Sequence, residues 1–231
     1  MRRAIFVLTL AVLAAWPRLG SAGNLDLRVG AFFPRASSNL FSDDASLYIR
    51  DDGKSLEKKD WIGWAGGIAY NSKIAPNLEL GIDLDGYGRR IRTSYANYTS
   101  DTGAEIRQSL QLSVVPLGVS LRAIPTSRRA RIAPFAEAGV DVVFYEYKES
   151  GDFIDFQDPT RSIYPDAFRS SGSVPGFHLG GGLRVAVSDD FSLVGHYRYY
   201  FAHENDMGGS FRGSSLDLNG GMATFGLNVR F

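Results

Sequence analysis

The sequence predicts an all-β fold, in which eight antiparallel strands close into a transmembrane β-barrel with short turns at one end and long loops at the other. Eight segments alternate apolar and polar side chains, and this period of two is typical of strands. The mean hydropathy of -0.11 agrees with a barrel, because polar lumen residues alternate with the lipid-facing ones and mask them. After residue 22, the sequence contains no apolar run long enough for a membrane-spanning helix.

The first 22 residues predict a secretory signal peptide. A basic start at Met1-Arg2-Arg3 leads into an apolar run from Ala4 to Trp16, and Gly20-Ser21-Ala22 offers a small-residue cleavage site. The apolar run is too short to span a bilayer, which disfavours the alternative of a retained amino-terminal anchor. We therefore expect residues 1–22 to be removed and residues 23–231 to form one barrel domain.

Four strands are expected in the first half of the chain. They are Leu25 to Phe33, Trp61 to Tyr70, a third from Leu78, and a fourth that ends at Arg122. In the third, leucine and isoleucine alternate with Glu79, Gly81, Asp83 and Asp85, which places the acidic residues on one face. The alternation slips at Val114-Val115-Pro116, so a β-bulge or an edge irregularity is predicted there.

Four further strands are expected in the second half. They are Ile132 to Tyr147, Gly176 to Val187, Phe191 to Ala202, and a terminal strand from near Leu218. Three connections are short, at Asn71–Asn77, Ala123–Arg131 and Ser188–Asp190, and four are long and polar, at Pro34–Asp60, Tyr95–Glu105, Lys148–Val174 and His203–Asp217. This alternation is typical of short periplasmic turns and long extracellular loops.

Two other architectures fit the sequence less well. A ten-stranded barrel would use Ala45 to Arg50 as a strand, but that segment is too short to span, so we expect an extracellular hairpin turning at Asp51-Asp52-Gly53. A soluble sandwich or lipocalin-type barrel would bury its apolar face. Here the large apolar face is paired with glycine, acidic residues and arginine, which favours apolar side chains toward lipid.

The segment Ser188 to Tyr200 resembles a recurrent motif of small outer-membrane barrels, namely the outer membrane protein A-like, opacity-protein-like and outer membrane protein W-like families. In that motif a short periplasmic turn leads into a strand that ends Tyr-Arg-Tyr, as at Tyr197-Arg198-Tyr199. Gly180–Arg184 and Pro134–Gly139 resemble neighbouring strands of the same families. The resemblance implies a monomeric barrel in the bacterial cell outer membrane, in contact with its lipid and lipopolysaccharide.

The last strand, Ala223 to Phe231, resembles the closing strand of such barrels. Its apolar face ends in an aromatic residue and carries the residues of an expected assembly signal: Phe225, Leu227, Val229 and Phe231. The resemblance implies that the barrel-assembly machinery reads this strand.

Seven charged residues are expected to face the lumen. They are Arg28, Asp83, Glu137, Asp141, Arg184, Arg198 and Arg230. An eight-stranded barrel is just wide enough for side chains to fill it, so we expect a salt-bridged core. In this core, the expected ion pairs join Arg28, Arg184 and Arg198 to Asp83, Glu137 and Asp141. Arg230 is expected near the periplasmic rim, close to Asp26 or Glu79. The alternative is a narrow ion path lined by the same groups.

The sequence favours a non-enzymatic protein with a structural or surface-interaction role through its extracellular loops. The long loops contain aromatic residues that either bind an external ligand or pack together as a cap: Phe41, Tyr48, Phe153, Phe156, Tyr164 and Phe168. The alternatives are a narrow pore or a conduit for small hydrophobic solutes, and a lipid-modifying enzyme. The histidine spacings resemble neither a metal site nor a catalytic pair, so no cofactor or metal is expected. Equal totals of 25 basic and 25 acidic residues argue against nucleic-acid binding.

Overall fold

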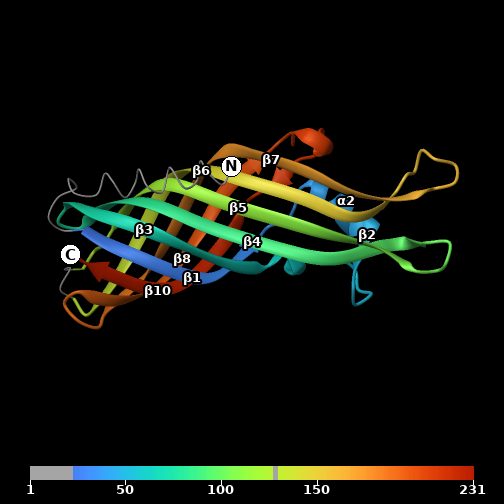
Figure 1. Cartoon of the computed structure of the whole chain (residues 1–231). Coiled ribbons are helices and arrows are strands. Elements are labelled where there is room, and N and C mark those ends of the chain that lie inside the picture. The colour runs from blue at the N-terminus through green and yellow to red at the C-terminus, as the bar shows by residue number, and fades with distance from the viewer. Residues whose placement is uncertain (1–22, 127–129) are drawn as a thin grey trace.

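The computed structural model describes residues 23–126 and 130–231, so the predicted signal peptide lies outside the described residues. Eight antiparallel strands form a closed ring (Figure 1). In ring order they are β1 (Gly23–Pro34), β3 (Gly63–Ala75), β4 (Leu78–Thr99), β5 (Glu105–Ala123), β6 (Ile132–Ile154), β7 (Ile163–Ala186), β8 (Phe191–Glu204) and β10 (Gly220–Arg230). The predicted barrel is confirmed, because β10 pairs with both β8 and β1.

The pairing register aligns the apolar side chains into one lipid-facing band. Leu227 of β10 lies opposite Leu27 of β1 on one side and Leu193 of β8 on the other. All three side chains are exposed on the outer wall. A one-residue slip would turn each apolar set into the lumen, so the alternation itself holds the register.

The extracellular ends of three strands reach well beyond the predicted positions. β4 continues to Thr99, β6 to Ile154, and β7 begins at Ile163. The expected loops Tyr95–Glu105 and Lys148–Val174 are therefore wrong for most of their length, since their residues form hairpins above the membrane (Figure 1). Outside the bilayer, the outer face is polar and the inner face is apolar, so these strands no longer show the membrane pattern.

The bulge predicted at Val114-Val115-Pro116 is also wrong. Leu84 pairs with Leu117 and Tyr87 with Val114, so the register between β4 and β5 is unchanged across this point. Val114 and Pro116 both point into the lumen. The apparent slip in the sequence marks the level at which the lumen changes from charged to apolar.

The segment between β1 and β3 folds over the extracellular opening. It contains α2 (Asn39–Leu47), β2 (Tyr48–Arg50) and the short helix η2 (Lys58–Trp61). The predicted hairpin turn at Asp51-Asp52-Gly53 is present, and Gly53 has a left-handed backbone with φ 75°. The predicted hairpin arm from Ala45 to Arg50 is wrong for residues 45–47, because they belong to the helix α2.

A second, smaller excursion joins β8 to β10 through η3 (Gly209–Phe211) and β9 (Leu216–Asp217). None of the helices in the described residues has the length and apolar character needed to cross a membrane.

Candidate functional site

A layer of ion pairs fills the membrane-spanning half of the lumen. Arg198 of β8 lies at its centre and contacts three carboxylates: Asp83 at 2.8 Å, Asp85 at 2.7 Å and Glu137 at 2.6 Å. The side chains of these four residues are each at most 2% exposed. Burial makes an unpaired charge very costly, and here each acid is met by a guanidinium.

Two further arginines extend this layer across the barrel. Arg122 of β5 bridges Asp26 at 2.9 Å and Glu137 at 3.0 Å, and its guanidinium lies 4.3 Å from the Phe135 ring centroid. Arg28 of β1 lies 3.1 Å from Asp85 and 3.6 Å from Asp83. The network therefore ties β1, β4, β5, β6 and β8 together through their inward side chains.

The structure brings together most of the predicted lumen charges, with different partners for some. Arg184 lies 3.3 Å from Glu79, a partner that was not among the acids expected for it. Asp141 contacts His178, with 2.8 Å between Oδ2 and Nδ1. Arg230 is half-buried at the periplasmic rim and donates a hydrogen bond to the Ser192 hydroxyl over 2.9 Å.

Sequence reasoning missed three members of the network: Asp26, Asp85 and Arg122. The sequence identifies Arg122 only as the end of a strand, although it follows the outward Leu121 and so has the inward phase. The strand alternation is the signal that could have found it. The alternation does place the two other residues on the inward face, but without assigning them to the network.

Asparagine side chains close the periplasmic end of the lumen. The Asn228 amide donates to Asn24 over 2.7 Å and to Asp26 over 2.6 Å, and the Asn71 amide donates to the same two side chains. All three asparagines are fully buried. Neutral amides can satisfy the remaining carboxylate oxygens without adding charge.

The extracellular half of the barrel interior is apolar and aromatic. Phe41 of α2 packs edge-on against Trp61 at 5.1 Å, and Trp61 lies 6.2 Å from Tyr147 of β6. Leu110 and Leu112 of β5 are 0% and 1% exposed beneath them. The loop aromatics thus pack as a cap over the charged layer.

The hairpin tips carry the other predicted loop aromatics. Phe153 packs against Phe168 at 4.7 Å, and Phe156 packs against Tyr98 at 5.4 Å. Phe156 keeps 53% of its surface exposed and Tyr164 keeps 37%. These rings pack together and still contribute apolar surface to the tip.

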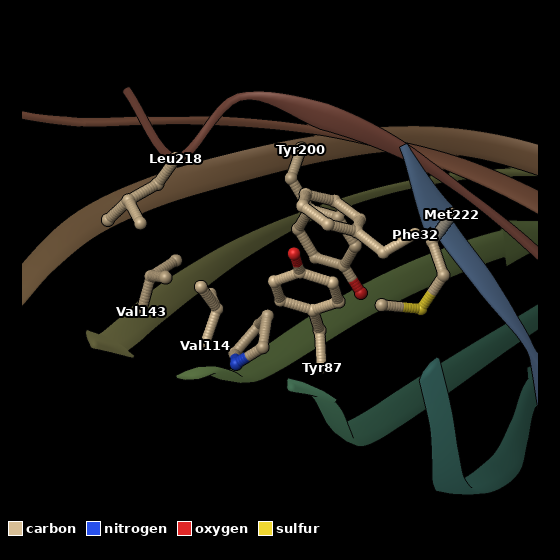
Figure 2. A pocket seen from close by; sticks show the side chains of 8 residues that line it. Phe32, Tyr87, Val114, Val143, Tyr200, Leu218 and Met222 are labelled. Carbon is tan, nitrogen blue, oxygen red and sulfur yellow. The ribbon is translucent and has the colours of Figure 1, made fainter. Parts of the chain in front are cut away.

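A small void separates the charged layer from the aromatic cap. Figure 2 shows the rings of Phe32, Tyr87 and Tyr200 turned toward one another, with Met222 alongside. The void measures about 10 Å³, which is room for roughly one water molecule. The Tyr200 hydroxyl donates to Asp85 over 2.5 Å, so this ring joins the two halves of the interior.

Two buried carboxyl groups meet where α2 docks on the barrel wall. The outward side chains of β6 change from Phe144 to Glu146, so Glu149 lies beyond the lipid-facing band. The Tyr147 hydroxyl lies 2.7 Å from Asp44 Oδ2 and 3.2 Å from Glu149 Oε1. Burial raises the pKa of Asp44 well above its usual range, and the nearby Glu149 charge raises it further. Burial also raises the pKa of Glu149.

Asp44→Asn is expected to hold α2 more tightly at neutral and alkaline pH. Below the ordinary carboxyl pKa of about 4, both docked and undocked states are protonated, and the pair carries no penalty. As pH rises, the undocked state loses its protons while the docked state retains one, so docking weakens. Hydrogen exchange of α2 amides measures this as a difference between wild type and variant that grows with pH. An equal pH dependence in the two proteins would contradict the explanation that the docked pair of Asp44 and Glu149 retains a proton.

The predicted assembly residues lie on the lipid-facing side of β10. Phe225, Leu227 and Phe231 are 60%, 49% and 57% exposed, and Val229 pairs with Leu25 of β1. The Phe231 ring stacks on Tyr70 of β3 at 6.2 Å. Their role as an assembly signal stays a prediction.

The histidines that face the lumen serve as hydrogen-bond partners of acids. His196 Nε2 lies 2.8 Å from Glu137, and its Nδ1 lies 2.7 Å from Arg28. Among residues 23–126 and 130–231, no cluster of three or more histidine and carboxylate side chains is arranged to hold a metal ion.

Comparisons with known proteins agree with the geometry. A family model described as the outer membrane protein beta-barrel domain matches residues 4–231. A major outer membrane protein from Thermus thermophilus has a similar fold, with a TM-score of 0.54 at 15% identity over 92% of this chain and 100% of that one.

Two other solved structures were also matched. OprG from Pseudomonas aeruginosa gives a TM-score of 0.49 at 11% identity, over 92% of this chain and 96% of that one. Neisserial surface protein A gives a TM-score of 0.48 at 15% identity, over 91% of this chain and 97% of that one. No curated protein sequence matches this chain.

Proposed function

Because this chain belongs to the outer membrane protein β-barrel domain family and so resides in the bacterial outer membrane, we propose that it is a closed, non-enzymatic barrel with a structural and surface-presenting role. The observation that supports this most is the filled interior. Asparagine amides, buried ion pairs and an aromatic cap succeed one another from the periplasmic rim to the extracellular end.

The filled interior supports a barrel that does not conduct. Conduction requires sites that an ion can enter and leave, with water along the way. Arg122, Arg184 and Arg198 are each at most 2% exposed and bound to carboxylates. An ion in transit would have to break these pairs and then cross the apolar layer around Leu110 and Leu112.

The extracellular extension supports the surface-presenting role. β4 to β7 rise above the bilayer as two hairpins with polar outer faces (Figure 1). Their stiffness comes from continuous pairing, which runs between β6 and β7 out to Ile154 and Ile163. Ring closure within one chain supports a monomer. Such rigid hairpins display side chains at fixed positions with little ordering cost when a partner binds.

Planar-bilayer recordings test the closed lumen. Refolded protein is expected to insert without steady single-channel openings. The mobility shift between unheated and boiled samples verifies that the protein is folded, so that a lack of channel openings is not attributed to unfolded protein. Steady unitary openings in most insertions would contradict the proposal and favour the pore alternative.

Incubation with lipopolysaccharide, followed by mass spectrometry of the lipid, tests the non-enzymatic part of the proposal. Loss of an acyl chain or another covalent change in the lipid would contradict it.

A further inference from the structure

A basic patch lies on the outer wall of β4 immediately above the lipid-facing band. From the periplasmic end, the outward residues of β4 are four aliphatic side chains, then Gly86 and Gly88, then Arg90 and Arg92. Both arginines are exposed. Within the described residues neither forms an ion pair, and the Arg90 Nε donates a hydrogen bond to Ser109 over 2.8 Å. The patch therefore presents two positive charges at the edge of the membrane.

Several acids near the patch pair with other cations, whereas the exposed Asp51 lies beside Arg92, with its amide nitrogen 3.4 Å from the Arg92 carbonyl oxygen. In the segment that folds beside β4, Arg50 pairs with Asp60 at 2.6 Å and with Asp52 at 3.1 Å. Lys59 pairs with Glu57 at 2.8 Å. These pairs remove Asp52, Asp60 and Glu57 from competition with an external anion for the arginines of β4.

A strip of the outer wall without side chains, at Gly86 and Gly88, leads from the arginines down toward the lipid. A Cβ atom added at Gly86 or Gly88 would meet nothing within 4 Å, so the wall has open space at both positions. Trp64 of β3 borders this bare strip, because Ala65 pairs with Tyr87 and places Trp64 beside Gly88. Trp64 is 79% exposed, and tryptophan is enriched at membrane–water interfaces.

We propose that the basic patch and the bare strip together bind a phosphorylated glycolipid of the outer leaflet. Arg90 and Arg92 would hold its headgroup phosphate, and an acyl chain would lie over Gly86 and Gly88 against the Trp64 ring. Arginine suits this role because its planar guanidinium can donate two parallel hydrogen bonds to a phosphate. The proposal rests on the outer-membrane location and is independent of whether the lumen conducts.

A lipid fits this surface better than an acidic protein. The bare strip is continuous with the apolar wall below it, since Leu84 and Ile82 are the next outward residues of β4. A protein partner would have to displace lipid from that wall. A phosphorylated lipid matches both the charge above and the apolar surface below with one molecule.

The test compares binding of diphosphoryl lipid A to the folded full chain and to two matched double variants in detergent. Arg90→Gln/Arg92→Gln is expected to weaken binding about 30-fold, because each arginine near an anionic surface contributes a factor of about five. Arg161→Gln/Arg212→Gln removes the same charge from exposed sites between β6 and β7 and between β8 and β10, and is expected to change binding little. Native mass spectrometry counts the bound lipid, and the heat-shift assay verifies folding.

Two further measurements separate the headgroup and the acyl chain. Dephosphorylated lipid A is expected to bind the wild type as weakly as diphosphoryl lipid A binds the Arg90/Arg92 double variant. Gly88→Phe places a large ring on the bare strip without altering charge and is expected to weaken binding several-fold. Equal losses in the two double variants, or undiminished binding of the dephosphorylated lipid, would overturn the proposal. Conductance of the same samples reports separately on the closed lumen.

Discussion

Replacing Arg198 with leucine is expected to destabilise the folded barrel by about 3–5 kcal/mol, the range for removing one partner of a buried ion pair. The change leaves Asp83, Asp85 and Glu137 with one fewer cation in a lumen where each of them is nearly inaccessible to solvent. Arg28 lies near Asp83 and Asp85 but also contacts His196. Arg122 lies near Glu137 but also pairs with Asp26. The three carboxylates would therefore repel one another across the barrel.

Urea titration of protein refolded in vesicles measures the change in the free energy of unfolding. The matched control is Arg107→Leu, which also removes an ion-paired arginine, but one with 71% of its side chain exposed. Exposed pairs contribute about 0–1 kcal/mol, so the control is expected to be nearly neutral. Equal effects of the two substitutions would show that the lumen pairs do not hold the barrel together.

Replacing Trp61 with alanine is expected to release the cap while leaving the membrane-spanning barrel intact. Trp61 is 1% exposed and packs between Phe41 of α2 and Tyr147 of β6. Truncating a buried tryptophan costs about 3–5 kcal/mol, and here the loss falls on docking of the segment between β1 and β3. The strand pairing below it does not depend on this ring.

Hydrogen exchange separates the two parts of the molecule. Amides of α2 are expected to exchange faster in the Trp61→Ala protein, while those of β1 and β10 keep their protection and the heat shift remains. Phe156→Ala is the control, since Phe156 is also aromatic and extracellular but more than half exposed. Loss of protection in β1 together with α2 would contradict separate stabilities for cap and barrel.

Most of the membrane-spanning part of the fold can be predicted from the sequence, because each strand there faces two different environments. Lipid selects apolar residues on one face, and a narrow lumen accommodates glycine and paired charges on the other. The alternation in Gly176 to Val187 and in the terminal strand shows both faces. The expected starts at Leu78, Ile132 and Phe191 coincide with those of β4, β6 and β8.

The same rule fails above the membrane. There water lies outside and the cap lies inside, so the faces exchange character: Tyr145 and Tyr147 point inward, and Glu146 and Lys148 point outward. The sequence signal becomes that of an ordinary antiparallel sheet with one buried face, which resembles a polar loop when membrane strands are sought. For this reason the sequence predicts loops where the structure has hairpins and α2.

The sequence by itself determined the number of membrane-spanning strands and which side chains of each strand face the lumen, because both follow from segments with a period of two. Only the tertiary structure decided which charges meet. Arg184 lies against Glu79 and Asp141 against His178 because the distance across the lumen depends on strand tilt and stagger, which the period of a single strand does not contain. The cap likewise arises from residues far apart in the sequence, brought together when the ring closes.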